Sequence, residues 1–277
     1  MARDGAVWTL NYSLHQDSAV WAFPVSAVRR QTRQPWRPSE WTVQTGNVVL
    51  RREGDYDIIT TTDGGPVPRT IRIRMTPVGG SLDREYDPAI PFSNGAVALY
   101  SEQFDIAPVG SIEALRSSET VSMLESVVVP VTYTDAAGPV LVNGERAVTG
   151  SSMTTPTYVV FGPGETEAGS GAAILADPAL PAWIRGELLD YMPKVLDGYT
   201  RRLGPRLNAD PPTMIASWNG PTLGKVDMSG GVRPGLILLA FEGEGVLDRE
   251  PRTLARARWF IAHEAAHFWL GSSGVAS

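Results

Sequence analysis

The sequence contains no cysteine and only three histidines among its 277 residues. The absence of cysteine excludes disulfide bonds and thiolate metal sites, but it is equally compatible with a reducing and an oxidising compartment. Long hydrophobic runs are also lacking: the longest obvious one, 235–241, is far shorter than a bilayer span and is typical of a buried strand. The net charge of −6 argues against nucleic acid or an anionic membrane surface as a partner.

A signal peptide is also lacking at the start of the sequence, where Met1-Ala2-Arg3-Asp4 leads directly into a strand pattern. A chain from which a signal peptide had been removed would look the same, so the sequence does not distinguish a cytoplasmic from an exported protein. We expect a soluble protein in either case. Hydrophobic residues make up 43% of the sequence and charged residues 19%, which is ordinary for a globular protein. The length is sufficient for two cores.

Residues 1–167 have the pattern of an all-β domain. Apolar Trp8, Leu10, Tyr12 and Leu14 alternate with polar residues, as expected of a half-buried strand. Turn signals separate the further strand candidates, which are 20–25, 41–45, 48–52, 56–60, 70–75, 96–100, 121–134, 140–142 and 157–161. About ten short strands at this spacing predict a sandwich or a saddle-shaped double sheet.

Two features of this domain have alternative interpretations. Trp36, Trp41 and Tyr56 are able to form a ligand platform, but large aromatic residues dominate β cores, and we interpret them as core residues. His15 is the one histidine outside the motif described below. It lies among polar residues after the first strand, which disfavours it as a metal ligand.

Residues 168–277 follow a glycine-rich junction and have a different pattern. Helical periodicity over 182–203 is interrupted by Pro193, which predicts a kink or a break. Two short apolar strands and a second helix are expected at 214–218, 236–241 and 251–270. The whole chain is therefore predicted to be α+β, with domains at 1–167 and 168–277.

The stretch His263-Glu264-Ala265-Ala266-His267 has the form HExxH and lies in the second predicted helix. Residues four apart lie above one another on one face of a helix. The two imidazoles can therefore bind one Zn²⁺ together, each through a nitrogen atom. Glu264 projects beside them, where a general base for hydrolysis has to stand. The alternative is an amphipathic helix with a buried histidine and a surface glutamate.

The longer run at 263–271, His-Glu-Ala-Ala-His-Phe-Trp-Leu-Gly, resembles the active-site helix of the aminopeptidase N-like gluzincins. There HExxHxW is followed by an apolar residue and glycine, and Trp269 and Gly271 match. The resemblance implies zinc-dependent hydrolysis of peptide substrates, with His263 and His267 as zinc ligands and Glu264 as general base. It also implies a β-rich domain followed by the upper lobe of a thermolysin-like catalytic domain, here truncated.

The resemblance places the third zinc ligand, a glutamate, about eighteen or nineteen residues after the second histidine, since catalytic zinc has three protein ligands. Ten residues follow His267, and none of them is Asp, Glu, His or Cys. We therefore expect one zinc ion in the complete enzyme, weak or absent zinc binding in the 277-residue chain, and little or no activity of this chain alone. A reading frame that continues past Ser277 with such a glutamate would favour the enzyme.

The glycine-rich segment before 236–241 extends the resemblance. In this family such a loop leads into an edge strand that pairs with the substrate backbone. The resemblance thus assigns substrate binding to Gly230, Gly231, Val232, Arg233, Gly235 and Leu236. Val232 stands where the family places the glutamate that binds a free amino terminus. Because valine cannot pair with an ammonium group, we expect the complete enzyme to prefer internal peptide bonds or blocked amino termini.

The sequence supports two functions. The first is a zinc metallopeptidase of which this chain is the N-terminal part. The alternative is a non-catalytic binding or scaffold module on a peptidase-derived fold, which the missing third ligand and Val232 motivate. We also expect self-association through the incomplete catalytic lobe, because the apolar side of the motif helix, including Phe260 and Phe268, would lack its partner.

Overall fold

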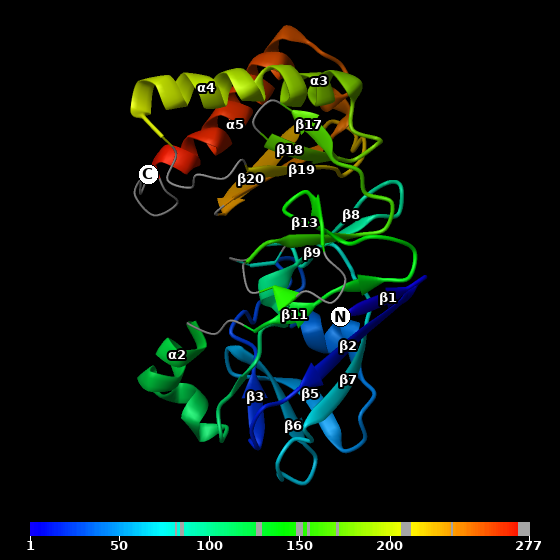
Figure 1. The fold of residues 1–277 in the computed structure, drawn as a ribbon, viewed down its shortest axis with the longest axis vertical. Helices are drawn as coiled ribbons and strands as arrows, with labels where there is room; N and C mark the ends of the chain where they lie inside the picture. The colour runs from blue at the N-terminus through cyan, green and yellow to red at the C-terminus, as the bar shows by residue number, and fades with distance from the viewer. Residues whose placement is uncertain are drawn as a thin grey trace. The chain divides into compact units, whose positions relative to one another are not determined.

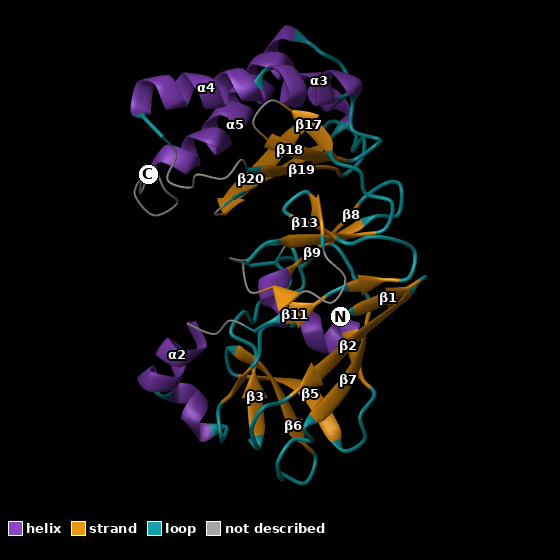
Figure 2. Cartoon of the chain, in the orientation of Figure 1, coloured by secondary structure: helices purple, strands orange, loops and turns teal. Residues whose placement is uncertain are grey.

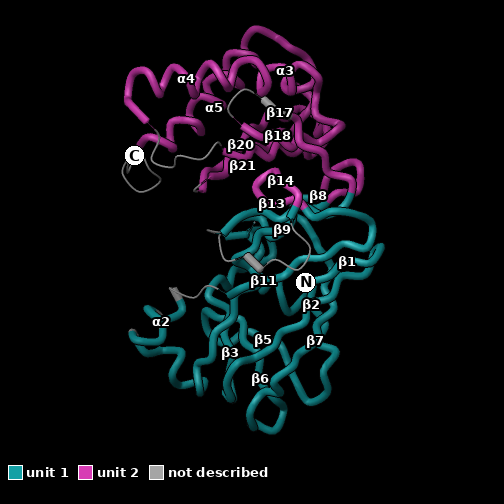
Figure 3. The backbone as a smooth tube through the Cα atoms, in the orientation of Figure 1, with its two compact units in different colours: residues 1–90, 97–140, 147–162 teal, residues 91–96, 141–146, 163–277 magenta. Residues whose placement is uncertain are grey.

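The computed structural model describes residues 1–80, 82–83, 86–125, 129–147, 152–153, 156–169, 172–205, 212–233 and 235–270. The chain forms two compact units, which Figure 3 draws in different colours. Unit 1 comprises residues 1–90, 97–140 and 147–162, and unit 2 comprises residues 91–96, 141–146 and 163–277. Strands predominate and helices are few (Figure 2), so the predicted α+β class is confirmed. The domain boundary at residues 167 and 168 stays a prediction.

Two sheets make up most of unit 1 (Figure 1). The first consists of β12 (Thr134–Asp135), β1 (Ala2–Asp4), β2 (Val7–Ser13), β7 (Thr70–Met75) and β4 (Trp41–Val43), in that order. The second consists of β10 (Ala107–Pro108), β3 (Val20–Ala22), β6 (Tyr56–Thr61) and β5 (Val48–Glu53). β1 pairs with β12 in parallel, and the other neighbours are antiparallel. This arrangement agrees with the hairpin-rich pattern of the sequence.

Shorter elements accompany these sheets. Strand β9 (Val97–Tyr100) pairs antiparallel with β16 (Tyr158–Phe161), and β11 (Val131–Thr132) pairs with β15 (Ser152–Met153). The remaining elements are α1 (Trp36–Glu40), β8 (Ala89–Pro91), η1 (Ser101–Phe104) and η2 (Glu113–Arg116).

Aromatic side chains join the two sheets of unit 1. Tyr12 of β2 and Trp41 of β4 both contact the ring of Phe23, which follows β3. Trp36 and Trp41 are buried, and Tyr56 packs against the core beside β3. The interpretation of these three residues as core rather than as a ligand platform is therefore confirmed.

The segment 121–134, which the sequence predicts as a single strand, begins as a helix. Helix α2 (Ser118–Glu125) occupies its first part, and residues 126–128 lie outside the described residues. The cause lies at the start of the helix, where the Ser117 hydroxyl accepts a hydrogen bond from the backbone N–H of Thr120 (3.1 Å). This N-cap stabilises the first helical turn. The strand prediction was wrong there because the capping signal at Ser117 was overlooked.

Unit 2 is built on a five-stranded sheet with helices on one side (Figure 1). The strand order is β17 (Glu167–Gly169), β18 (Ala172–Ala176), β19 (Thr213–Trp218), β21 (Leu236–Glu242) and β20 (Asp227–Arg233). The three inner strands are parallel, and both edge strands are antiparallel to their neighbours. The other elements are α3 (Ala182–Asp190), α4 (Met192–Leu203), α5 (Pro251–Leu270), η3 (Glu244–Val246) and the hairpin of β13 (Leu141–Val142) and β14 (Glu145–Arg146).

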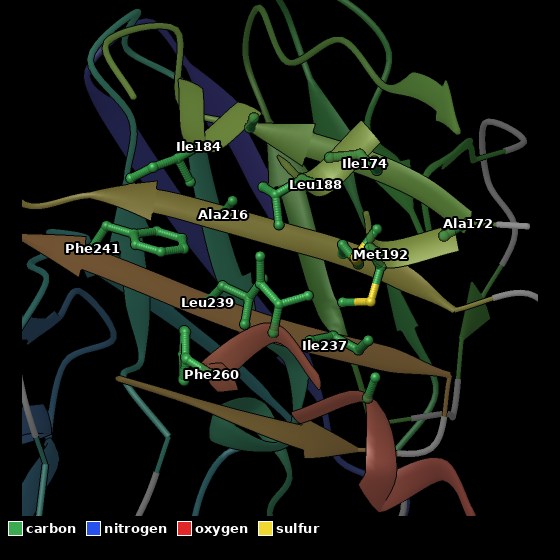
Figure 4. Close-up of a cluster of buried hydrophobic side chains, with 14 of the residues drawn as sticks. Ala172, Ile174, Ile184, Leu188, Met192, Ala216, Ile237, Leu239, Phe241 and Phe260 are labelled. Atoms are coloured by element: carbon green, nitrogen blue, oxygen red, sulfur yellow. The ribbon is translucent and has the colours of Figure 1, made fainter. Parts of the chain in front are cut away.

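The helices and the sheet of unit 2 share one hydrophobic core (Figure 4). Ile237, Leu239 and Phe241 of β21 point into it at every second position. Phe260 of α5 meets Phe241 edge-on, with the ring centroids 5.9 Å apart. Each such side chain contributes about 1.5–3 kcal/mol relative to an exposed position. The core therefore holds α5 firmly against the end of the sheet where β20 and β21 lie.

The predicted break at Pro193 is confirmed. Helix α3 ends at Asp190 and α4 begins at Met192, so that Pro193 lies in the first turn of a new helix. Proline is tolerated there because the backbone N–H that it lacks would have no partner within the helix. Gly204, with φ of 87°, ends α4. The predicted second helix is also confirmed as α5, whereas Gly271, which matches the family motif after it, lies outside the described residues.

Candidate metal centre

Helix α5 carries the HExxH motif and lies with one face on the core. Ala257, Phe260, Ile261, Ala265 and Phe268 are buried on that face. The expectation that Phe260 and Phe268 are exposed is therefore wrong, because the sheet and the other two helices cover them within unit 2. Self-association through the incomplete catalytic lobe stays a prediction, but Phe260 and Phe268 no longer support it.

The two histidines of the motif lie together on the outer side of α5. The ring centroids of His263 and His267 are 5.1 Å apart, and the ring planes stand at 87°. Two imidazoles that share one tetrahedral zinc ion have centroids about 5 Å apart, given Zn–N bonds of about 2.0–2.1 Å. The spacing of the pair therefore fits two ligands of one zinc ion.

Glu264 lies next to the pair and is 6% exposed. Burial raises the pKa of its carboxyl above the ordinary value, and attraction to His263 and His267 opposes that shift. A carboxyl in this environment exchanges a proton closer to neutral pH than an exposed one does. The alternative of a surface glutamate is therefore wrong for this position.

The described residues place no third metal ligand beside the two histidines. In the part of the chain that the structure describes, no three His, Cys, Asp or Glu side chains gather closely enough to hold a metal ion. His15 belongs to unit 1, where its ring lies edge-on to Trp21 at 5.6 Å. The described residues thus bring together two histidines at a spacing that fits zinc and a neighbouring carboxyl.

The C-terminal turn of α5 is held by Trp269. Its indole Nε1–H donates a hydrogen bond to the carbonyl of Gly204 (2.8 Å), and its ring lies 5.3 Å from that of Tyr199. The Tyr199 hydroxyl donates to the carbonyl of Ala262 (3.1 Å), directly before the motif. These contacts fix both ends of the HExxH segment on α4. The sequence motif indicates Trp269, but it does not indicate that Tyr199 contacts the motif helix. The position of Tyr199 on the apolar side of the predicted helix at 182–203 is the one feature of the sequence that points to this contact.

A charged cluster joins α5 to α3. Glu187, which is buried, accepts hydrogen bonds from Arg258 Nε (2.7 Å) and from Arg249 Nη2 (3.2 Å). The Arg258 guanidinium also lies over the ring of Tyr191. These arginines hold the pKa of Glu187 below its ordinary value against the opposing effect of burial. The cluster was not predicted, because Glu187 and Arg258 are far apart in sequence.

The predicted glycine loop is a strand. Residues 227–233 form β20, which pairs with β21 in the register Gly230 to Leu239 and Val232 to Ile237. It is β20 that lies at the edge of the sheet, whereas 236–241, the predicted edge strand, is paired with β19 and β20 on its two sides. The prediction was wrong because two adjacent glycines are typical of a loop, and only the pairing partner shows otherwise.

Gly230 brings β20 close to α5. A Cβ atom at this position would lie 2.4 Å from the carbonyl oxygen of Leu238 and 2.9 Å from Cζ of Phe260. Val232 packs against the same core as Phe260. Because side chains alternate along a strand, Gly231 and Arg233 belong to the opposite face. The absence of a side chain at Gly230 therefore allows the edge strand to lie directly beside the motif helix.

No protein-family model matches the sequence, and no curated protein sequence matches it. Among solved structures, an aminopeptidase N family protein from Idiomarina loihiensis is similar, with a TM-score of 0.56 and 9% identity over 97% of this chain and 46% of that chain. Yeast LTA4 hydrolase has a TM-score of 0.42 and 12% identity over 95% of this chain and 39% of that chain. An M1 zinc metallopeptidase from Deinococcus radiodurans has a TM-score of 0.35 and 16% identity over 98% of this chain and 62% of that chain.

The first of these similarities defines the fold. The chain has the fold of the N-terminal part of an aminopeptidase N family protein. It spans about half of that protein's length, since it covers 46% of it. Among the described residues, no helix is long and apolar enough to cross a membrane.

Proposed function

We propose that this chain supplies the zinc-binding helix and the substrate-binding strand of a zinc metallopeptidase that hydrolyses peptide bonds. The observation that carries the proposal is the pair of histidine rings on α5, 5.1 Å apart, with the buried carboxyl of Glu264 beside them. The fold shared with an aminopeptidase N family protein supports it.

The residues of α5 have separate roles in this proposal. A bound zinc ion would supply Lewis-acid polarisation of the scissile carbonyl and would acidify a water molecule. His263 and His267 hold the ion on the outer side of the helix. Glu264 accepts the proton of the attacking water and passes it to the leaving amine. Burial of Glu264 keeps competing solvent away from this carboxyl.

We assign binding of the substrate backbone to β20 in place of 236–241. An extended peptide can add to the edge of a sheet by main-chain hydrogen bonds, and no other described strand pairs with the outer edge of β20. Gly230, Gly231, Val232 and Arg233 lie on this strand. Gly235 and Leu236, the other proposed substrate-binding residues, lie in the turn after β20 and at the start of β21. They would act by supporting β20 from within the sheet.

In the complete enzyme, we expect faster cleavage of an acetylated longer peptide than of a free-amino dipeptide amide. Val232 cannot pair with an ammonium group, and an unpaired charge in a partly buried site is unfavourable. An extended peptide with a blocked amino terminus can still form main-chain hydrogen bonds with β20. The measurement is kcat/KM for both substrates. Faster turnover of the free-amino substrate would show that another carboxylate binds the amine, and the endopeptidase proposal would fail.

The 277-residue chain is expected to bind zinc weakly through His263 and His267, because two imidazoles leave the coordination shell of the ion incomplete. Zinc content after dialysis and a competition titration with a chromophoric chelator measure this. His263→Ala and His267→Ala should remove the binding, and His15→Ala should leave it unchanged. Equal binding by all four proteins would contradict the metal site. Stoichiometric zinc that survives dialysis would mean that another group completes it.

A further inference from the structure

Trp259 lies one helical turn before the first motif histidine and is 66% exposed. Tryptophan is usually well buried, so core packing does not explain this residue. Its indole ring stacks on the imidazole of His263, with the centroids 5.3 Å apart and the planes at 24°. His263 is in turn 5.1 Å from His267. Three aromatic rings therefore form one row along α5, and His263 is in the middle.

Helix geometry explains the row. Side chains in an α-helix lean towards its N-terminus, over the residue one turn earlier. His263 consequently lies on the face of Trp259, and His267 lies against His263. His263 is exposed, so without the indole ring of Trp259 its imidazole would have several rotamers open to it.

We propose that Trp259 is a positioning residue of the metal centre, whose flat indole face holds the His263 imidazole in the orientation from which it shares a zinc ion with His267. The inference rests on the proposed function above. Ordering a mobile side chain costs conformational entropy when a metal binds. A stack that orders His263 beforehand removes part of that cost, as contacts behind a ligand residue generally do.

The size of the effect follows from the strength of an aromatic stack. Trp259→Leu keeps the apolar bulk but removes the flat ring, and zinc affinity should fall about three- to tenfold. Trp259→Phe keeps a flat ring and should retain most of the affinity. Because Trp259 is largely exposed, neither substitution should change the thermal stability of the chain appreciably.

The experiment uses the whole 277-residue chain and two readouts. The first is Zn²⁺ affinity by chelator competition for the wild type, Trp259→Leu, Trp259→Phe and His263→Ala. The second is the NMR spectrum of the imidazoles without metal, in which only three histidines contribute. In Trp259→Leu the His263 signal should move downfield because the ring current of the indole is lost. The His15 signal, whose partner is Trp21, should not move.

Leu270→Ala is the matched control, since Leu270 is an exposed apolar residue at the other end of the same helix. It should leave both readouts unchanged. Unchanged zinc affinity or an unmoved His263 signal in Trp259→Leu overturns the positioning role, provided that His263→Ala lowers the affinity. Zinc affinity that does not depend on His263 instead overturns the proposed metal site, and with it the inference.

Discussion

Replacing Glu264 with glutamine is expected to lower kcat/KM for peptide hydrolysis in the complete protein by about 10²–10⁴-fold, the factor that a positioned general base contributes. Glutamine has nearly the shape of glutamate, so it fits the same buried position beside His263 and His267. It cannot accept a proton from the attacking water. The measurement is the initial rate of hydrolysis of a blocked peptide, made together with the zinc content of both proteins.

The zinc content separates the role of Glu264 from that of the histidines. Glu264→Gln should bind as much zinc as the wild type, because the carboxyl lies beside the ligand pair and is not one of its two ligands. Glu244→Gln, which alters an exposed carboxylate in the same unit, should change neither rate nor zinc content. A Glu264→Gln enzyme with nearly the wild-type rate would exclude this residue as the base.

Gly230→Ala is expected to lower the free energy of unfolding of unit 2 by about 2–3 kcal/mol, because overpacking of a dense contact has costs of this order. The new Cβ atom would meet the Leu238 carbonyl at 2.4 Å and the Phe260 ring at 2.9 Å. The carbonyl belongs to the backbone of β21, which is paired with β19 and β20 on its two sides, and it cannot move aside alone. Thermal unfolding followed by circular dichroism measures the loss, which corresponds to a fall in Tm of about 5–10 °C.

Gly186 offers the matched control. It lies within α3, and a Cβ atom there would meet nothing within 4 Å. Gly186→Ala should therefore raise stability by about 0.5–1 kcal/mol, because alanine is the better helix former. If both alanine variants changed stability in the same direction, the close approach of β20 to α5 at Gly230 would not be the cause.

Local patterns in the sequence were sufficient for the helices of unit 2. The apolar spacing of 251–270 predicts α5, and Pro193 predicts the break between α3 and α4. Both features depend on interactions within a few residues, namely the helical period and a missing backbone donor. At 121–134 the strand prediction was wrong, because the Ser117 hydroxyl caps a helix that begins before this segment.

The edge strand shows why other parts could not be predicted. The segment 227–233 has two glycines and little apolar periodicity, so nothing in it alone indicates a strand. This segment becomes β20 because the backbone of β21 supplies its hydrogen-bonding partners. The lack of a side chain at Gly230 also leaves room for the ring of Phe260. Both partners lie beyond the segment itself, and no local rule takes account of them.

The sequence by itself determined that a helix presents His263, Glu264 and His267 in HExxH spacing, since a helical period places residues four apart on one face. Only the tertiary structure decided what surrounds them. It buried Glu264, placed β20 next to the helix through Gly230, and left Trp259 stacked on His263 in an exposed position. The physical reason is that spacing along a helix is a property of the backbone, whereas burial and neighbours depend on residues that folding brings together.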